Sequence, residues 1–300
     1  MRPVKLYIIG NGFDLWHGIP SSYSQFKEYV KRHRPEILDA IDDYIPADEG
    51  WSDLEGALAG LDVDGIVDDL SVFMPSYADD SWSDAGHHDF QYEVDRVVQL
   101  ISTQLRATFG EWIRTLEMPV PGESQRRLST LDVQALFLNF NYTSTLEDLY
   151  AVPDSQVLHI HGYAKIPDSE LVLGHAWNPE RHRSLNDRLA IEDMDTRLVE
   201  AHDILDDYFS RTFKPSDRII LKHQDFFNRL SSIKTVYVLG HSLSEVDRPY
   251  IRALLGIPAV ADSSWYLACR SEDERGTKRD RLVQLGVQGP RALTVLWDEL

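Results

Sequence analysis

Two imidazoles near the middle of the chain are suited to acid–base chemistry. His159 and His161 flank a single apolar residue, and Gly162 follows directly. Alternation along an extended segment places both rings on one face, where either could act as a base near pH 7 or bind a metal ion. A metal site needs more than two ligands, and no nearby Cys or acidic motif completes a set. We therefore expect His161, beside the glycine, to perform the chemistry and His159 to be a buried, hydrogen-bonded histidine.

A second candidate is Asn141, in the segment LNFNYTSTLE that spans residues 138–147. Its amide has a donor and an acceptor at neutral pH, so it can orient a sugar hydroxyl or a water molecule without taking up charge. The alternative is a structural role, in which Thr143 or Ser144 begins a helix and Asn141 stabilises the turn. The segment ends an apolar run, and strand ends are where α/β sheets present side chains to a ligand.

A glycine turn follows the first apolar run of the chain, where Gly10 and Gly12 precede Phe13 and Asp14. Glycines let backbone N–H groups approach a pyrophosphate, and the N-terminus of the next helix adds partial positive charge. The dinucleotide motif G-x-G-x-x-G is incomplete, because Leu15 replaces its third glycine. A plain strand-to-helix turn is the alternative.

Another glycine turn, with Gly240, Ser242 and Ser244, resembles the nucleophile elbow G-x-S-x-G. Ser244 replaces the second glycine of that motif, and no histidine follows His241. Because the hydrolase fold with this elbow needs Ser, acid and His in chain order, the sequence argues against a serine esterase. The same turn could instead contact a ribose or a phosphate.

Short apolar runs alternate with helical stretches around these motifs, as in a doubly wound α/β domain. Runs without polar alternation indicate a sheet that is covered on both faces. We therefore predict an α/β fold with a doubly wound, Rossmann-like and mostly parallel sheet. The predicted strands are 4–9, 135–139, 157–160, 171–173, 235–239, 265–269 and 293–297, and the predicted helices are 23–33, 144–150, 247–255 and 272–285.

The acidic residues are concentrated in one segment. The chain has 49 Asp and Glu against 30 Lys and Arg, and residues 35–95 contain 18 of the acids and none of the bases. Apolar spacings in this segment suit amphipathic helices, and residues 89–116 have a strong helical period. We predict an acidic helical insertion at 35–129, set into a Rossmann-like nucleotide-binding domain made of 1–34 and 130–300. The acidic run is either a solvated face or a docking surface for a basic partner.

Composition argues against several classes of protein. A net charge of −19 opposes general binding to nucleic acid or to anionic membranes, because phosphate-rich surfaces would repel the chain. The lone Cys269 allows no intrachain disulfide and no multi-cysteine zinc site. This usage suits a reducing compartment, so we expect a cytoplasmic protein. No run approaches the roughly 18 apolar residues of a membrane-spanning helix. Assembly into a homo-oligomer stays open.

Several segments, taken in order, resemble the AbiH family of bacterial abortive-infection proteins, and the resemblance extends over nearly the whole chain. The segments are IIGNGFDL at 8–15 with HGIP at 17–20, WSDLE at 51–55, NYTSTLE at 141–147, HIHG at 159–162 and GHSLSEVDRPY at 240–250. More distantly, the chain resembles sirtuin-like NAD-binding enzymes. That resemblance implies nucleotide contacts from Gly10, Asn11, Gly12, Phe13, Thr143, Gly240 and Ser242.

The sirtuin-like resemblance also implies catalytic roles. Asn141 would orient the ribose hydroxyls or a water molecule, and His161 would be the general base. Thr143 stands where an acid is expected, and Asp14, which replaces a serine, would supply the missing carboxylate. Because the four-cysteine zinc module of protein deacetylases is missing, the resemblance points to NAD-cleaving defence enzymes, with NAD as the substrate and no metal.

We therefore expect an anti-phage abortive-infection protein that hydrolyses NAD+ at the nicotinamide–ribose bond and so causes growth arrest. One alternative is a non-catalytic nucleotide-sensing module that acts through a protein partner or phage trigger bound to the acidic insertion. Thr143 in the place of an acid favours that alternative. A second alternative is a metal-dependent hydrolase that uses His159 and His161.

Overall fold

The structure is a computed structural model that describes residues 3–74, 88–120, 126–167, 169–188 and 195–300. The chain divides into two compact units. The first, here called the sheet unit, comprises Met1–Ser22, Trp112–Val172 and Pro215–Leu300. The second, the helical unit, comprises Tyr23–Glu111 and Leu173–Lys214.

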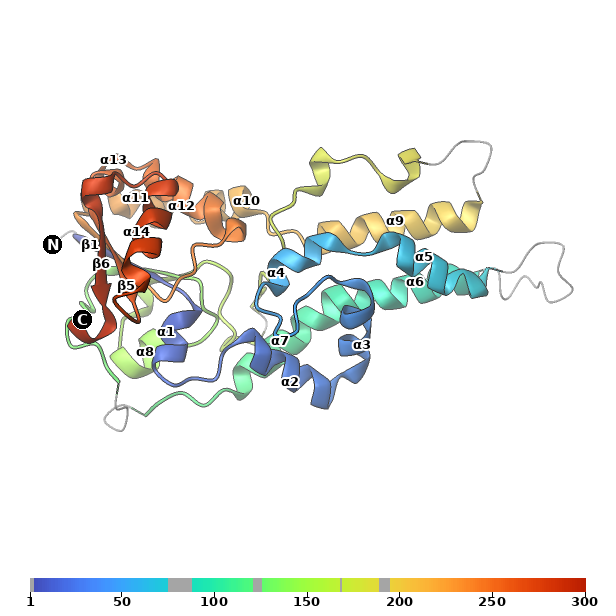
Figure 1. Ribbon diagram of the computed structural model, residues 1–300, viewed down its shortest axis with the longest axis horizontal. Helices are drawn as coiled ribbons and strands as arrows, with labels where there is room; N and C mark the ends of the chain where they lie inside the picture. Colours follow the sequence, from blue (N-terminus) through green and yellow to red (C-terminus); the bar gives the residue numbers. More distant parts are fainter. Residues whose placement is uncertain (1–2, 75–87, 121–125, 168, 189–194) are drawn as a thin grey trace, which may run out of the picture. The chain divides into compact units, whose positions relative to one another are not determined.

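The sheet unit contains a six-stranded sheet in which every strand pairs in parallel with its neighbours (Figure 1). The strands are β1 (Lys5–Ile9), β2 (Leu136–Asn139), β3 (Val157–His159), β4 (Thr235–Leu239), β5 (Ser264–Cys269) and β6 (Ala292–Leu296). Their order is β3-β2-β1-β4-β5-β6, so the chain reverses direction across the sheet between β1 and β4. The predicted doubly wound α/β fold is confirmed, and this reversal is where such folds bind ligands.

One predicted strand is wrong. Residues 171–173 have no partner strand, although their apolar side chains suggested one. Val172 instead donates its N–H to the carbonyl of His161 (2.8 Å) and accepts a bond from the Tyr142 hydroxyl (2.6 Å). Val172 is thus held by one hydrogen bond to each of two loops. The run of three apolar residues is buried without the repeated backbone bonds of a β-strand.

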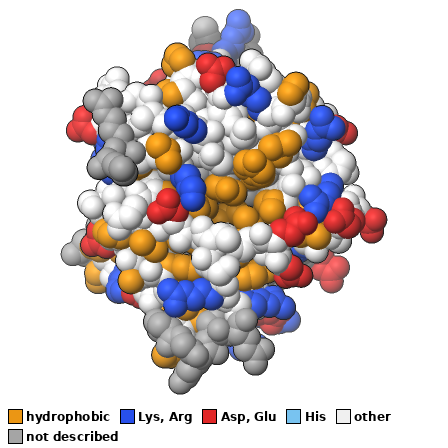
Figure 2. Space-filling model, turned by 90° about the vertical axis from the view of Figure 1, so that its left-hand side faces the viewer, with side chains coloured by type: hydrophobic (Ala, Val, Ile, Leu, Met, Phe, Trp, Pro, Cys, Tyr) orange, Lys and Arg blue, Asp and Glu red, His pale blue; other side chains and the backbone are white. Residues whose placement is uncertain are grey.

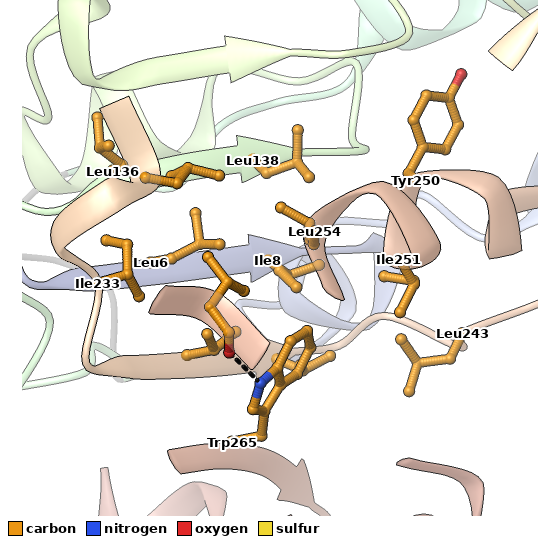
Figure 3. Close-up of a cluster of buried hydrophobic side chains, with 14 of the residues drawn as sticks. Leu6, Ile8, Leu136, Leu138, Ile233, Leu243, Tyr250, Ile251, Leu254 and Trp265 are labelled. Carbon is orange, nitrogen blue, oxygen red and sulfur yellow. Dashed lines mark hydrogen bonds between the residues drawn. The ribbon is translucent and has the colours of Figure 1, made fainter. Parts of the chain in front are cut away.

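Side chains of successive strand residues pack into two hydrophobic cores, one on each face of the sheet. Leu6 and Ile8 belong to the first core, whereas Tyr7 and Ile9 belong to the second. Figure 3 shows the first core, in which the Trp265 indole N–H donates to the carbonyl of Val260 (3.1 Å). Both faces are therefore apolar along the same strands, which explains their lack of polar alternation.

Different helices supply the two cores. The second core receives α1 (Asn11–Trp16) and α8 (Thr145–Tyr150). The first core receives α10 (Ser216–Lys222), α11 (Gln224–Asn228), α12 (Arg248–Leu255), α13 (Pro258–Ala261) and α14 (Glu274–Gln284). The three helices predicted here at 144–150, 247–255 and 272–285 are confirmed within one or two residues.

A row of stacked rings crosses the second face of the sheet. Tyr7 stacks on Phe137 (ring centroids 5.0 Å apart) and on Tyr237 (5.1 Å), and Tyr237 stacks on Tyr266 (5.3 Å). Tyr7 is buried, whereas Tyr237 and Tyr266 are only half-buried. On the face in Figure 2, hydrophobic side chains gather near the centre, and both basic and acidic side chains lie around them.

The described residues of the helical unit are mostly helical. They are α2 (Tyr23–His33), α3 (Pro35–Tyr44), α4 (Leu54–Ala57), α5 (Val63–Leu70), α6 (Asp89–Gln99), a π-helical turn (Leu100–Gln104), the start of α7 (Leu105–Thr115) and α9 (Thr196–Arg211). The helical period predicted over 89–116 is confirmed, and α2 has its predicted bounds.

Short 3₁₀ turns occur in both units. They lie at 58–60, 71–73, 154–156, 179–181, 185–188, 229–232, 245–247, 289–291 and 297–299.

Residues 173–214 group with the helical unit by their contacts, although the sequence analysis counted them with the sheet domain. The Tyr208 hydroxyl on α9 donates to the carbonyl of Leu58 (2.9 Å), and Gln91 on α6 donates to Glu200 (2.8 Å). These bonds join segments more than 100 residues apart. Patterns among neighbouring residues could not predict such contacts.

Candidate functional site

The two glycine turns meet at the point where the strand order reverses. The N–H of Gly10 donates to the carbonyl of Leu239 (3.0 Å), and that of Gly12 donates to the carbonyl of Gly240 (2.8 Å). A Cβ on Gly240, whose φ is +70°, would lie 2.0 Å from the backbone nitrogen of Phe13. The glycines therefore permit backbone contact between two turns. Their N–H groups already have protein acceptors, so the pyrophosphate contacts expected at Gly10 and Gly12 have no support from these donors.

A short helix, α1, begins at Asn11, earlier than the sequence suggested. The Asn11 amide donates to the carbonyl of Ser21 (2.8 Å) and accepts from its hydroxyl (2.6 Å). Phe13 is buried in the second core, 4.4 Å from the ring of His17. In this structure the side chains of Asn11 and Phe13, both expected to contact a nucleotide, hold the turn and the core.

His17 closes α1 against α8. One ring nitrogen lies 2.7 Å from the carbonyl of Phe13, and the other lies 2.7 Å from the hydroxyl of Tyr150. Burial lowers the pKa of His17 to about 4, so the ring is neutral. The HGIP segment thus has a clear structural role, because it fixes the position of α1 and of Asp14 on it.

Asp14 is almost fully buried and is bonded to two threonines from the loop after β2. The Thr143 hydroxyl donates to one carboxylate oxygen (2.6 Å), and the Thr145 hydroxyl donates to the other (2.7 Å). Burial raises the pKa of Asp14 to about 6, although hydrogen bonds from Thr143, Thr145 and Asn141 oppose the rise. We call Asp14, Asn141, Thr143 and Thr145 the Asp14 cluster.

Asn141 links the loop after β2 to the first glycine turn. Its amide nitrogen donates to the carbonyl of Gly10 (3.2 Å), and its own backbone N–H donates to the side chain of Asn139 (3.0 Å). Helix α8 begins at Thr145 with Ser144 before it, and no side chain caps that end. Asn141 therefore stabilises the turn between strands, and it does not cap the helix.

His159 has hydrogen-bonding partners at both ring nitrogens. Nε2 lies 2.8 Å from Glu147 on α8, and Nδ1 lies 3.2 Å from the carbonyl of Asn141. The ring of Tyr163 stacks on the imidazole at 4.1 Å. His159 is therefore hydrogen-bonded as expected, but it is half-buried, whereas His161 is the buried histidine of the pair.

His161 has different neighbours. Its Nε2 faces one carboxylate oxygen of Asp247 at 3.7 Å, and Nε2 of His241 faces the other at 3.5 Å. Rings of Phe140 and Tyr250 lie 5.2 and 5.3 Å from the His161 ring. We call His161, His241 and Asp247 the His161 cluster.

The structure therefore groups the predicted site residues in two places. Asp14, Asn141 and Thr143 lie together beside Gly10, next to the helices of the second core. His161 lies with Phe140 and Tyr250, which belong to the first core. Ser242 is exposed in the turn between Gly240 and Leu243. The expectation that Asn141 orients the ribose or a water molecule while His161 acts as the base stays a prediction.

Four neighbours of the site were missed by sequence reasoning: Thr145, Glu147, His241 and Asp247. Thr145 and Glu147 follow Asn141 closely. Thr145 donates to the buried Asp14, whereas Glu147 is a bonding partner of His159. His241 and Asp247 lie in the GHSLSEVD segment, where the sequence pointed to Gly240 and Ser242 as the contact residues. Their convergence on His161 depends on the position of β4 relative to β3, which has no local signal.

The WSDLE segment lies in the helical unit. The Tyr23 hydroxyl donates to Glu55 (2.6 Å), and the other oxygen of Glu55 pairs with the fully buried Lys214. Trp51 is buried against Phe26, with ring centroids 5.8 Å apart. These contacts join the two chain segments that form the helical unit.

Two further features concern the described residues as a whole. No group of three or more His, Cys, Asp or Glu side chains within them is arranged to hold a metal ion. None of the helices in those same ranges is long and apolar enough to cross a membrane.

A parallel sheet in the order β3-β2-β1-β4-β5-β6, with buried polar side chains after β1, β2, β3 and β4, defines a Rossmann-type α/β protein. The family model described as bacteriophage abortive infection AbiH matches residues 6–268, and the chain belongs to this family. The matched range includes both polar clusters and the WSDLE segment. Searches of curated proteins and of solved structures found no match.

Proposed function

We propose that the protein hydrolyses the nicotinamide–ribose bond of NAD+ as its contribution to abortive infection. The observation that supports this proposal is the placement of buried polar side chains after four strands of a Rossmann-ordered sheet. The buried side chains of Asp14, Asn141, His161 and His241 follow β1, β2, β3 and β4, at the edge where such folds bind nucleotides. A core made only for stability would place apolar side chains there, because buried polar groups are costly unless they are bonded.

The reaction requires little covalent chemistry from the protein. The bond between C1′ of the ribose and the nicotinamide nitrogen breaks, and its electron pair leaves with neutral nicotinamide. Water then attacks C1′, its proton passes to a base, and ADP-ribose is formed. An enzyme therefore has to stabilise a positively charged sugar and position one water molecule.

The polar clusters suggest a role for each residue. The amide nitrogen of Asn141 is held by the carbonyl of Gly10, so we assign its oxygen to a ribose hydroxyl or to the water. His161 would accept the proton. Asp14 lies 2.6 Å from the hydroxyl of Thr143, the residue that replaces an expected acid, so its negative charge is available near that position.

The adenosine side of the nucleotide is assigned to the second glycine turn. Ser242 is exposed there, and its hydroxyl could bond a ribose or a phosphate. Because the N–H groups of Gly10 and Gly12 donate within the protein, the pyrophosphate needs donors from elsewhere in this turn or from the solvent.

Nicotinamide release from NAD+ by the purified full chain, alone and with candidate phage triggers, tests the proposal. We expect release by the unmodified protein and its loss in Asn141→Ala and His161→Ala. Asn228→Ala and His223→Ala change the same residue types at positions outside both clusters and should retain activity. Unchanged release in both site variants would remove the residue assignment, and a folded protein that never releases nicotinamide would contradict the hydrolase.

A nucleotide-sensing module is the second candidate, and the exposed carboxylates of α5 favour it. Asp64, Asp68 and Asp69 are exposed on this helix, and Asp62 caps its start through the N–H of Gly65 (3.0 Å). This function predicts binding of NAD+ or ADP-ribose without product. It also predicts that Lys at Asp64, Asp68 and Asp69 abolishes growth arrest without changing nucleotide affinity.

A further inference from the structure

One carboxylate lies between two imidazoles that come from different strands. Asp247 precedes α12, His161 follows β3 and His241 follows β4. The Nε2 atoms of the two rings face different oxygens of Asp247, at 3.7 and 3.5 Å. These distances exceed those of a formed hydrogen bond. In ligand-free enzymes catalytic hydrogen bonds are often long and shorten when the substrate binds.

The tautomer of His241 follows from its backbone contact. The N–H of Leu243 donates to Nδ1 of His241 (2.8 Å), so this nitrogen is an acceptor. A neutral His241 must therefore bear its proton on Nε2, the atom that faces Asp247. His241 is thus oriented by the N–H of Leu243 at one ring nitrogen and by Asp247 at the other. Nε2 of His161 also faces the carboxylate of Asp247.

The turn that positions His241 has an unusual backbone. Leu243 has a φ of +56°, a left-handed conformation that is rare for a bulky side chain. Its carbonyl accepts from Nε and Nη2 of Arg281 (3.2 and 3.0 Å), and its side chain is buried in the first core. Figure 3 shows Leu243 and Tyr250 beyond Ile8, on the side to which the strands point. Such strain persists where surrounding contacts enforce it, and it is typical of functional sites.

Aromatic rings fix the planes of both imidazoles. The Phe140 ring lies 5.2 Å from His161 and 4.2 Å from His241, at interplanar angles of 84° and 75°. Tyr250 packs on the same Phe140 ring and on His161. The rings are held edge-on to a shared phenyl group, and this packing leaves their Nε2 atoms directed at Asp247.

We propose that Asp247 is the positioning residue of His161, and that His161 acts through Nδ1. This inference rests on the proposed function only in taking His161 as the base. The carboxylate favours a proton on Nε2, which leaves the basic lone pair on Nδ1. When water attacks C1′, its proton passes to Nδ1, and Asp247 stabilises the imidazolium until the proton leaves to solvent. His241 shares the carboxylate and keeps it oriented.

The first test needs no substrate. Nitrogen NMR spectra of the full chain with ¹⁵N-labelled histidine report which ring nitrogen is protonated, at about pH 8, where an unperturbed imidazole is neutral. We expect both His161 and His241 as Nε2–H tautomers. In Asp247→Asn the His161 signals should move toward a mixture of tautomers, whereas His241 should change less because the N–H of Leu243 still holds its Nδ1.

Two further variants make the test specific. Glu245→Gln removes an exposed carboxylate two residues away and should leave both spectra unchanged. Asp247→Glu keeps the charge and should restore much of the Nε2–H form of His161, which also covers the case in which Asp247→Asn fails to fold. Identical His161 spectra in the unmodified protein and in the folded Asp247 variants would overturn the inference.

Kinetics separate this inference from the proposed function. If NAD+ is turned over, Asp247→Asn should lower kcat on the order of 10²-fold while KM changes little, because positioning acts on the proton transfer. A tautomer change without any nicotinamide release would overturn the proposed function alone. Full turnover in Asp247→Asn with an unchanged spectrum would overturn the positioning role alone.

Discussion

The two polar clusters of the sheet unit differ in how tightly their groups are held. In the Asp14 cluster the threonine hydroxyls lie 2.6 and 2.7 Å from a buried carboxylate. In the His161 cluster the imidazoles lie 3.7 and 3.5 Å from theirs. The first distances are those of strong charge-assisted bonds, and the second are too long for hydrogen bonds. Both clusters lie on loops that leave the same edge of one sheet.

This contrast suggests a division of labour. A carboxylate whose oxygens already accept two short bonds can hold a loop, but it has little capacity for a new partner. The imidazoles of the His161 cluster lie farther from their carboxylate, so a change in their protonation breaks no short bond to Asp247. We therefore expect changes at Thr143 and Thr145, which bond the Asp14 carboxylate, to affect mainly stability. Changes in the His161 cluster and at Asn141, whose amide oxygen we assign to the substrate, should affect mainly chemistry.

Gly240→Ala should have the largest effect, because it disturbs both clusters. The new Cβ would lie 2.0 Å from the nitrogen of Phe13 and 2.4 Å from the carbonyl carbon of Gly12. Backbone must move at the start of α1, so we expect a loss of more than about 4 kcal/mol of unfolding free energy, measured by urea titration. Gly18→Ala is the matched control. Its φ is +83° and no atom lies within 4 Å of the new Cβ, so only about 1–2 kcal/mol of backbone strain applies.

Asp14→Asn should remove a pH dependence of stability. The pKa of Asp14 rises from 3.8 to about 6 on folding, so the folded state favours the protonated acid. The stability that this group contributes is therefore complete below about pH 4 and is lost as the pH rises through about 6. Two pKa units correspond to about 3 kcal/mol.

Urea unfolding at several pH values checks this sign. The unmodified protein should lose stability relative to Asp14→Asn between about pH 4 and pH 6. Asp148→Asn is the control, because the pKa of that partly exposed carboxyl is lowered by bonds from Lys165 and Ser144. Parallel curves for the unmodified protein and Asp14→Asn would contradict a raised pKa.

Thr145→Val should cost about 2 kcal/mol, since it deletes a bond to a buried charge without changing the shape of the side chain. The variant should also raise the pKa of Asp14 further, because a hydrogen bond that lowers it is lost. Thr145→Ser keeps the hydroxyl and should lose much less. Equal stability of the Val and Ser variants, by thermal or urea unfolding, would mean that the hydroxyl bond stabilises nothing.

His161→Gln should have the smallest effect attributable to an ion pair, because the ring faces Asp247 at 3.7 Å, a distance longer than a hydrogen bond. The comparison variant is His159→Gln, whose ring has a partner within 2.8 Å at Nε2 and within 3.2 Å at Nδ1. We expect His159→Gln to destabilise the protein more and His161→Gln to impair nicotinamide release more. If His161→Gln were the more destabilising variant and His159→Gln the less active one, the proposed division between structural and catalytic residues would be wrong.

Local sequence patterns were sufficient for most elements of the fold. Six of the seven predicted strands exist, and α2 has its predicted bounds, because apolar period and strand-like runs depend only on neighbours in the chain. Four short helices, α1, α10, α11 and α13, were not predicted, since each has at most seven residues and shows no clear period. The 16-residue α9 was not predicted either. The false strand at 171–173 arose because an apolar run reports burial and not strand pairing.

The chain alone established the class of fold, the segments that resemble AbiH proteins, and the residue types that follow each strand. Tertiary structure decided what those residues do to one another. Gly12 meets Gly240 across 228 residues of sequence, and His161 meets Asp247 only because β3 and β4 end at one edge of the sheet. Hydrogen bonds and packing act over a few ångströms, so partners distant in the chain are set by strand order, which no local pattern encodes.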